Sequence, residues 1–157
     1  MRKLIVLSAV PGAGKSTWAK KYRMSNPHTI IISSDDIRYE LTGSYQDFSK
    51  QKEVWELFEK RIKEYSHYDG DINVILDAVI DLNTLREKYA ILGKDYDQRV
   101  LVVIYKPFDV VQKTNKERPK EKWVPDEVLN MLYHKFEFPT KEVIDMYDEY
   151  YYIDNYF

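Results

Sequence analysis

The sequence contains no cysteine among its 157 residues, and this absence excludes disulfide bonds and thiolate metal sites. A reducing compartment is the natural home of such a chain, so we predict a cytoplasmic protein. It also has no apolar run close to the roughly 18 residues that a membrane span needs, so no membrane partner is expected. There are no repeats, no low-complexity tracts and no linker long enough to separate a second domain.

The balance of charge is close to neutral. Lys and Arg number 24 against 26 Asp and Glu, which gives a formal net charge of −2. This balance excludes a generally basic surface for nucleic acid but leaves room for a local basic groove. Hydrophobic residues make up 44% and charged residues 32%, as in ordinary globular proteins. We therefore predict one folded domain over residues 1–157.

Strand and helix patterns alternate along the chain. Apolar runs predict strands, and 3.6-residue spacing or capping residues predict helices. The expected strands are 4–10, 29–33, 72–76 and 99–105, with a short last strand at 150–153. The expected helices are 15–24, 50–66, 82–92, 109–117, 125–136 and 140–147, and residues 41–49 are expected to form a mobile loop. This alternation predicts an α/β fold, a parallel sheet of four to five strands with helices on both faces.

The clearest chemical motif lies between the first strand and the first helix. Residues 9–16 read Ala-Val-Pro-Gly-Ala-Gly-Lys-Ser, a Walker A loop with alanine in its first position. Small residues let backbone N–H groups converge on phosphate, and the helix N-terminus adds its positive dipole end. Lys15 is expected to reach the β- and γ-phosphates, and the Ser16 hydroxyl to bind Mg²⁺. The predicted ligand is ATP or another nucleoside triphosphate, held by Pro11, Gly12, Ala13, Gly14, Lys15, Ser16 and Thr17.

Acidic and basic side chains follow the second expected strand. In open α/β sheets, ligands bind beyond the carboxyl ends of the strands, so residues 33–38 should face the phosphate loop. A carboxylate here, at Asp35 or Asp36, can accept the proton of an attacking hydroxyl, and Arg38 can hold a substrate phosphate. Equally, one aspartate can serve as a helix N-cap with Arg38 in solvent, and local sequence alone leaves both readings open.

Residues 10–19 followed by Asp35-Asp36-Ile37-Arg38 resemble the 5′-hydroxyl polynucleotide kinases, notably the kinase half of phage polynucleotide kinase–phosphatase. The resemblance extends to residues 115–118 (Asn-Lys-Glu-Arg), similar to the family's lid segment, and to residues 124–129 after the lid. It implies a P-loop kinase fold and transfer of the γ-phosphate of ATP to the 5′-hydroxyl of an RNA or DNA end. The expected partner is a single-stranded or end-frayed nucleic acid.

The same resemblance assigns roles to individual residues. It makes Asp35 the general base, Arg38 the group that holds the acceptor's phosphate, and Arg118 the cation that stabilises charge on the transferring group. Asp36 is then expected to cap the short helix that carries Arg38.

This sequence departs from the family at two places. After the third strand, related kinases commonly have Asp-x-Thr-Asn, whereas residues 77–80 read Asp-Ala-Val-Ile. Asp77 remains, either to contact the lid arginine, acceptor or metal-bound water, or merely as a polar residue that ends a strand. The chain also lacks the Asp-x-Asp-Gly-Thr segment of a phosphatase, so no phosphatase domain is expected.

A charged segment after the fourth strand predicts a basic helical lid, at about residues 113–124. Residues 113–122 hold five basic and two acidic side chains and no large apolar one. Charge runs usually form solvated helix ends. Phosphoryl transfer, however, needs a cation over the γ-phosphate that does not block nucleotide entry, and a closing lid supplies one. Arg118 is the candidate for that cation.

Three other functions stay open at this point. A P-loop kinase for a small-molecule hydroxyl, such as a nucleoside, sugar or antibiotic, shares the phosphate machinery and differs only in its acceptor pocket. The loss of Thr and Asn after Asp77 favours this alternative. A nucleotide-binding regulatory module would be expected to lack the base or the lid arginine, and both are present. A kinase-like toxin is the third alternative.

Overall fold

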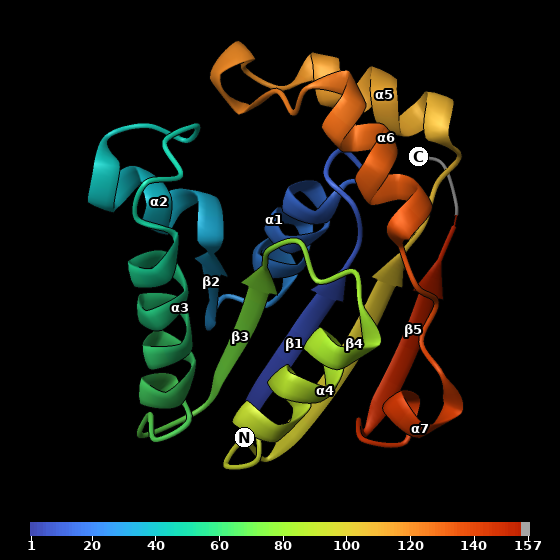
Figure 1. The fold of residues 1–157 in the computed structure, drawn as a ribbon. Helices are drawn as coiled ribbons and strands as arrows, with labels where there is room; N and C mark the ends of the chain where they lie inside the picture. Colours follow the sequence, from blue (N-terminus) through green and yellow to red (C-terminus); the bar gives the residue numbers. More distant parts are fainter. Residues whose placement is uncertain (155–157) are drawn as a thin grey trace.

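One five-stranded parallel sheet organises the computed structural model, which describes residues 1–154 (Figure 1). Its strand order is β2-β3-β1-β4-β5. The strands are β1 (Arg2–Ser8), β2 (Thr29–Ser33), β3 (Ile72–Asp77), β4 (Gln98–Ile104) and β5 (Glu149–Ile153). The α-helices are α1 (Lys15–Ser25), α2 (Ser34–Thr42), α3 (Gln51–Tyr65), α4 (Asn83–Leu92), α5 (Phe108–Glu117), α6 (Asp126–Lys135) and α7 (Lys141–Ile144), and a 3₁₀ turn, η1, spans Lys120–Lys122.

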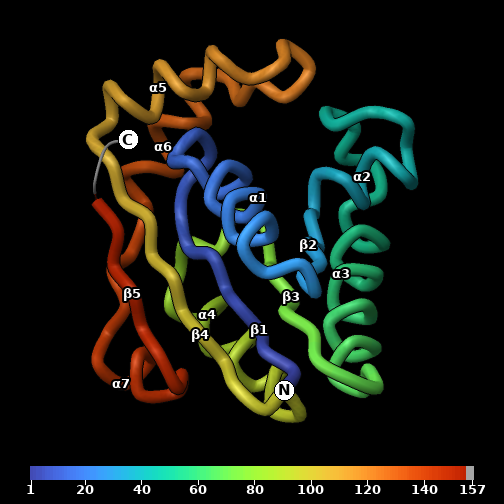
Figure 2. Tube along the Cα trace, turned by 180° about the vertical axis from the view of Figure 1, so that it is seen from behind, coloured from blue at the N-terminus to red at the C-terminus, as the bar shows by residue number. Residues whose placement is uncertain are grey.

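The two faces of the sheet are covered by different helices. Successive side chains of a strand point to opposite faces, so β1 divides its buried residues between two cores. Leu4 and Val6 pack with residues of α3, α4 and α7, whereas Ile5 and Leu7 pack with residues of α1, α5 and α6. Figure 1 shows α3 and α4 in front of the sheet, and Figure 2, turned by 180°, shows α1 on the other side. The predicted α/β architecture is confirmed.

Three neighbouring strands end beside one another at the edge of the sheet that faces the lid. β1 leads into the phosphate loop, β2 leads directly into α2, and β3 ends at Asp77. The register pairs Ser33 with Asp77. Polar residues that are far apart in the sequence therefore meet at one edge, as expected for parallel strands.

The predicted strands are all present, including the short last one. The segment at 41–49 was predicted to be irregular throughout, but α2 extends to Thr42 and ends at Gly43, whose φ of 79° is left-handed. That backbone conformation favours glycine and is a common helix ending. Within residues 1–154, no helix is both long enough and apolar enough to cross a membrane.

Candidate functional site

The phosphate loop is built from backbone that only small residues allow. Gly12 has a φ of 84°, and a Cβ added there would lie 2.7 Å from the carbonyl oxygen of Val111 in α5. Gly14, with a φ of 103°, is the N-cap of α1. The loop thus packs directly against α5 and opens onto the N-terminus of α1, where backbone N–H groups are free to bind an anion.

Lys15 lies at the start of α1, with its ammonium directed back over the loop. Its Nζ donates to the carbonyl oxygen of Ala9 over 3.3 Å. Burial lowers the pKa of Lys15, and the negative charge of Asp77 partly opposes that effect. A partly desolvated cation with a carboxylate close by is well suited to bind phosphate oxygens in exchange for the loop carbonyl.

Ser16 and Asp77 bring two oxygen ligands together. The Ser16 hydroxyl donates to Asp77 Oδ2 over 3.0 Å, joining the first turn of α1 to the end of β3. Mg²⁺ in nucleotide sites is commonly bound by a P-loop hydroxyl, one or two carboxylates, and substrate phosphates. These two side chains fit that donor set. Within residues 1–154 there is no cluster of three or more His, Asp or Glu side chains that could bind a metal ion without such help.

Asp35 and Asp36 lie in the first turn of α2, and Ser33 is the N-cap. The Ser33 side chain accepts a hydrogen bond from the backbone N–H of Asp36 over 3.3 Å. The prediction that Asp36 caps this helix was therefore wrong, because the residue three positions earlier has the extended backbone that a cap requires. Asp35 lines the cavity beside the phosphate loop, whereas Asp36 is exposed and does not.

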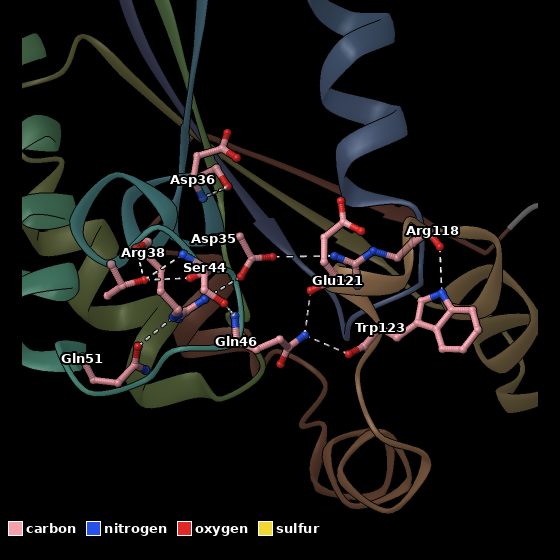
Figure 3. A network of polar contacts seen from close by, with 11 residues as sticks. Asp35, Asp36, Arg38, Ser44, Gln46, Gln51, Arg118, Glu121 and Trp123 are labelled. Atoms are coloured by element: carbon pink, nitrogen blue, oxygen red, sulfur yellow. Dashed lines mark hydrogen bonds and ion pairs between the residues drawn. The ribbon is translucent and has the colours of Figure 1, made fainter.

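The Asp35 carboxylate lies between two arginines from opposite sides of the site (Figure 3). Its Oδ1 accepts from Arg38 Nη1 over 2.7 Å, and its Oδ2 lies 3.6 Å from Arg118 Nη2 of the lid. Arg38 is only 4% exposed and also donates from Nε to Gln51 Oε1 over 3.0 Å. Arg38 therefore fixes the orientation of Asp35, and Arg118 links the lid to it.

These groups surround one cavity of about 470 Å³. Its polar lining includes the phosphate loop, Asp35, Arg38, Asp77 and Arg118. Its apolar lining comes from the loop between α2 and α3 (Tyr45, Phe48), from α3 (Trp55), from the segment after β3 (Ala78, Val79), and from α6 and the residues before it (Val124, Val128, Leu132). The apolar Val79 faces the cavity where related kinases carry a polar side chain, while Ile80 is buried in the core.

The base of the lid is held by a buried amide. Asn115, with an exposed fraction of 0%, donates from Nδ2 to the carbonyl oxygen of Val124 and accepts at Oδ1 from its N–H, over 2.8 and 3.1 Å. The two hydrogen bonds join the last turn of α5 to Val124, two residues before α6 begins. Residues 116–123 thus form a loop whose two flanking residues are hydrogen-bonded to each other. This loop places Arg118 over the cavity.

We expect Asn115→Ala to lower the melting temperature. The change leaves the two Val124 backbone groups without their partner, which costs about 1–3 kcal/mol. For a chain of this size that corresponds to a decrease of roughly 2–12 °C. Thermal melting measures it, with the exposed Asn130→Ala on α6 as the matched control. A melting temperature of Asn115→Ala equal to that of the control would contradict this role.

A second set of contacts joins the lid to the loop between α2 and α3. Gln46 Nε2 donates to the carbonyl oxygens of Glu121 and Trp123, each over 3.0 Å (Figure 3). Lys122 Nζ lies 4.6 Å from the centre of the Tyr45 ring. Together with the Arg118–Asp35 pair, these contacts bridge the mouth of the cavity.

Sequence reasoning did not assign a role to Gln46, Gln51 or Asn115. Asn115 fell within the segment that resembles the family's lid, so it carried a weak signal. Gln46 and Gln51 carried no such signal. Gln46 bonds to main-chain carbonyls of the lid and Gln51 to the buried Arg38 guanidinium, and only the fold brings these partners close.

Comparisons with known proteins identify the family of this chain. The family model described as "Chromatin associated protein KTI12" matches residues 2–144. Among curated proteins, L-seryl-tRNA(Sec) kinase of Methanococcus maripaludis is 30% identical over an alignment that covers 92% of this chain and 57% of the relative. The chain thus spans little more than half the length of that protein.

Solved structures show the same fold. Kti12 of Chaetomium thermophilum, solved with ADP-AlF3, has a TM-score of 0.69 at 15% identity and covers 96% of this chain and 88% of its own. A chain of the Pnkp1/Rnl/Hen1 RNA repair complex has a TM-score of 0.71 at 21% identity, over 85% of this chain and 43% of its own. With a family model that spans nearly its whole length, the chain belongs to the KTI12 family of P-loop kinase-like proteins.

Proposed function

We propose that this chain is an ATP-dependent kinase that transfers the γ-phosphate to the 5′-hydroxyl of an RNA or DNA end. The observation that carries the proposal is the position of Asp35. Its carboxylate lines the same cavity as the phosphate loop and lies 3.6 Å from the lid arginine, Arg118. A base, a nucleotide site and a lid cation in one cavity are what transfer to a hydroxyl requires, and slow hydrolysis by a regulatory module would not need them together.

The reaction follows from these positions. Asp35 accepts the proton of the acceptor hydroxyl as its oxygen bonds to the γ-phosphorus. The bond from that phosphorus to the bridging oxygen breaks, and ADP leaves. Arg118 exchanges the Asp35 carboxylate for the equatorial oxygens of the transferring group, where negative charge must be stabilised. Arg38 keeps Asp35 in place throughout, because its side chain contacts Asp35 in α2, Gln51 in α3 and Phe48 in the loop between them, and these residues lie outside the lid.

The nucleotide is bound by the loop and by two oxygen ligands. Lys15 exchanges the Ala9 carbonyl for the β- and γ-phosphates. Ser16 and Asp77 would hold Mg²⁺, which, when bound, neutralises charge on the phosphates. The Kti12 structure with ADP-AlF3, a nucleotide complex on the same fold, supports nucleotide binding here.

A nucleic acid acceptor is supported by relatives and by the lining of the cavity. The kinase that shares 30% identity acts, by its name, on a seryl-tRNA, and the Pnkp1 neighbour comes from an RNA repair complex. In this chain, Arg118 and Lys122 line the cavity together with Tyr45 and Phe48. Cations suit the phosphates of a strand, and rings suit its bases.

A small-molecule hydroxyl is the second candidate, and Val79 favours it. Val79, Val128 and Leu132 give the cavity an apolar wall after β3 and along α6. An apolar wall provides no hydrogen bond for the sugar–phosphate backbone and could accept an apolar alcohol instead.

The test supplies γ-labelled ATP and Mg²⁺ with four acceptors in parallel. These are a 5′-hydroxyl oligonucleotide of RNA or DNA, a nucleoside 3′-monophosphate, a seryl-tRNA and a panel of small alcohols. We expect label on the oligonucleotide. Label on the alcohols or on the seryl group alone, with none on the oligonucleotide, would overturn the proposal.

A further inference from the structure

Phe48 is an exposed ring beside the catalytic base. It lies in the loop between α2 and α3, is 54% exposed and lines the cavity. An aromatic side chain with this much exposed surface contributes little to the core. Its position in the cavity therefore indicates that a ligand covers the ring when bound.

The ring is held in a defined position. Its face lies 4.5 Å from the guanidinium carbon of Arg38, which is itself fixed by Asp35 and Gln51. The surrounding loop is ordered by short-range hydrogen bonds, among them Ser49 N–H to Asp47 Oδ1 over 2.9 Å. Gln46 attaches the same loop to the lid. The ring is thus pre-organised, so a ligand that stacks on it loses little affinity to ordering the loop.

Much of the Phe48 side chain is uncovered. Arg38 lies against the ring, yet 54% of the side chain is exposed. Tyr45 differs, because Tyr39 and Lys122 both pack against it. A flat group in the cavity can therefore reach exposed surface of Phe48.

Phe48 and Asp35 share one neighbour, Arg38. Arg38 links the two positions, through its 2.7 Å bond to Asp35 and its 4.5 Å contact with the ring. Asp35 and Phe48 line the same cavity, so a nucleoside whose 5′-hydroxyl lies at Asp35 has its nucleobase in the cavity that the ring lines. The phosphate that follows would lie in the part of the cavity lined by the cations Arg118 and Lys122.

We propose that Phe48 is a base-stacking platform for the 5′-terminal nucleotide of the acceptor. The inference deepens the proposed function and rests on it. Stacking on an aromatic face tolerates every base, so the platform would select for a nucleobase at the end of the strand without selecting its identity. Small alcohols without a flat ring would gain nothing from it.

The experiment compares two oligonucleotides that differ only at the 5′-terminal residue, which is complete in one and abasic in the other. Both carry the 5′-hydroxyl. For the wild-type protein we expect the abasic end to raise KM by roughly 5- to 150-fold, the range that base stacking on an aromatic side chain spans, with kcat nearly unchanged. Equilibrium binding of both strands, measured by fluorescence anisotropy, should show the same ratio.

The variant Phe48→Leu keeps an apolar side chain and removes the ring. We expect it to raise KM for the complete strand and to bring the two strands within about twofold of each other, while Phe48→Trp restores the difference. The matched control is Phe138→Leu, which removes a ring with a similar exposed fraction of 50% that does not line the cavity. It should keep the wild-type ratio, and melting temperatures confirm that all variants fold.

Three results would overturn the platform, and they differ in what they imply. If the wild-type protein uses both strands equally, or if Phe48→Leu keeps the wild-type ratio, the base does not stack on Phe48, while labelling of the strands still supports the kinase. If neither strand is labelled or bound, the proposed function falls as well.

Discussion

Asp35→Asn is expected to lower the rate of phosphoryl transfer by about 10²–10⁴-fold, the contribution typical of a general base. Asparagine keeps the size of the side chain but cannot take up the acceptor's proton. Nucleotide affinity should stay close to that of the wild type, because the phosphate loop, Ser16 and Asp77 are unchanged. Single-turnover transfer to a 5′-hydroxyl oligonucleotide and equilibrium nucleotide binding measure the two quantities.

The same variant should remain folded. Removing one partner of a buried charge is strongly destabilising, and Arg38 is such a charge. The amide oxygen of asparagine, however, can still accept from Arg38 Nη1, and Arg38 keeps its bond to Gln51. We therefore expect a decrease of only a few degrees in melting temperature.

Asp36→Asn is the matched control, since it makes the same chemical change one position away. Asp36 is exposed, and Ser33 rather than its own side chain caps α2. The substitution removes one favourable charge from the first turn of the helix, worth about 0.3–1 kcal/mol, and should leave transfer unchanged. An inactive Asp36→Asn beside an active Asp35→Asn would show that the base has been assigned to the wrong residue.

The sheet could be predicted because its strands are short apolar runs between clear breaks. Buried parallel strands need apolar residues on both faces, and β1, β3 and β4 carry them. The phosphate loop was equally clear, because glycine at left-handed positions and the Lys-Ser pair occur in one short segment. Residues 33–38 could be placed at the site because polar residues after β2 must lie at the carboxyl edge of the sheet, whereas the choice of Asp35 over Asp36 came from the resemblance to the polynucleotide kinases.

The capping residue of α2 and the fastening of the lid could not be predicted in the same way. Ser33 and Asp36 both suit a cap, and only the backbone geometry after β2 decides between them. Asn115 holds Val124 through main-chain atoms, which have no sequence signature. The Arg118–Asp35 pair joins residues 83 positions apart in the chain, and it depends on how α5 and α2 are placed across the sheet.

Arg118 has two partners in the proposed mechanism, Asp35 before transfer and the γ-phosphate during it, and its substitution is the second change with a large expected effect on turnover. In this structure its guanidinium is paired with Asp35, so the mechanism that we propose requires Arg118 to leave Asp35 for the γ-phosphate. The pair is partly exposed, with 25% of the Arg118 side chain and 43% of the Asp35 side chain accessible, and contributes at most about 1 kcal/mol to stability. Moving Arg118 from Asp35 to the γ-phosphate therefore costs little free energy.

Arg118→Ala is expected to lower turnover by about 10³–10⁵-fold, the range over which an arginine stabilises charge in phosphoryl transfer. Nucleotide affinity should change little, because the cation acts mainly when charge builds on the transferring group. The fold of the lid should persist, since Trp123 Nε1 bonds to the backbone carbonyl of Arg118 over 2.7 Å and not to its side chain.

Lys120→Ala is the control, an exposed cation of the same lid that does not line the cavity. Single-turnover rates and nucleotide binding are measured for both variants. Equal losses of nucleotide affinity and turnover in Arg118→Ala would make it a clamp on the bound nucleotide, and an equal loss of turnover in Lys120→Ala would make the effect one of general lid charge.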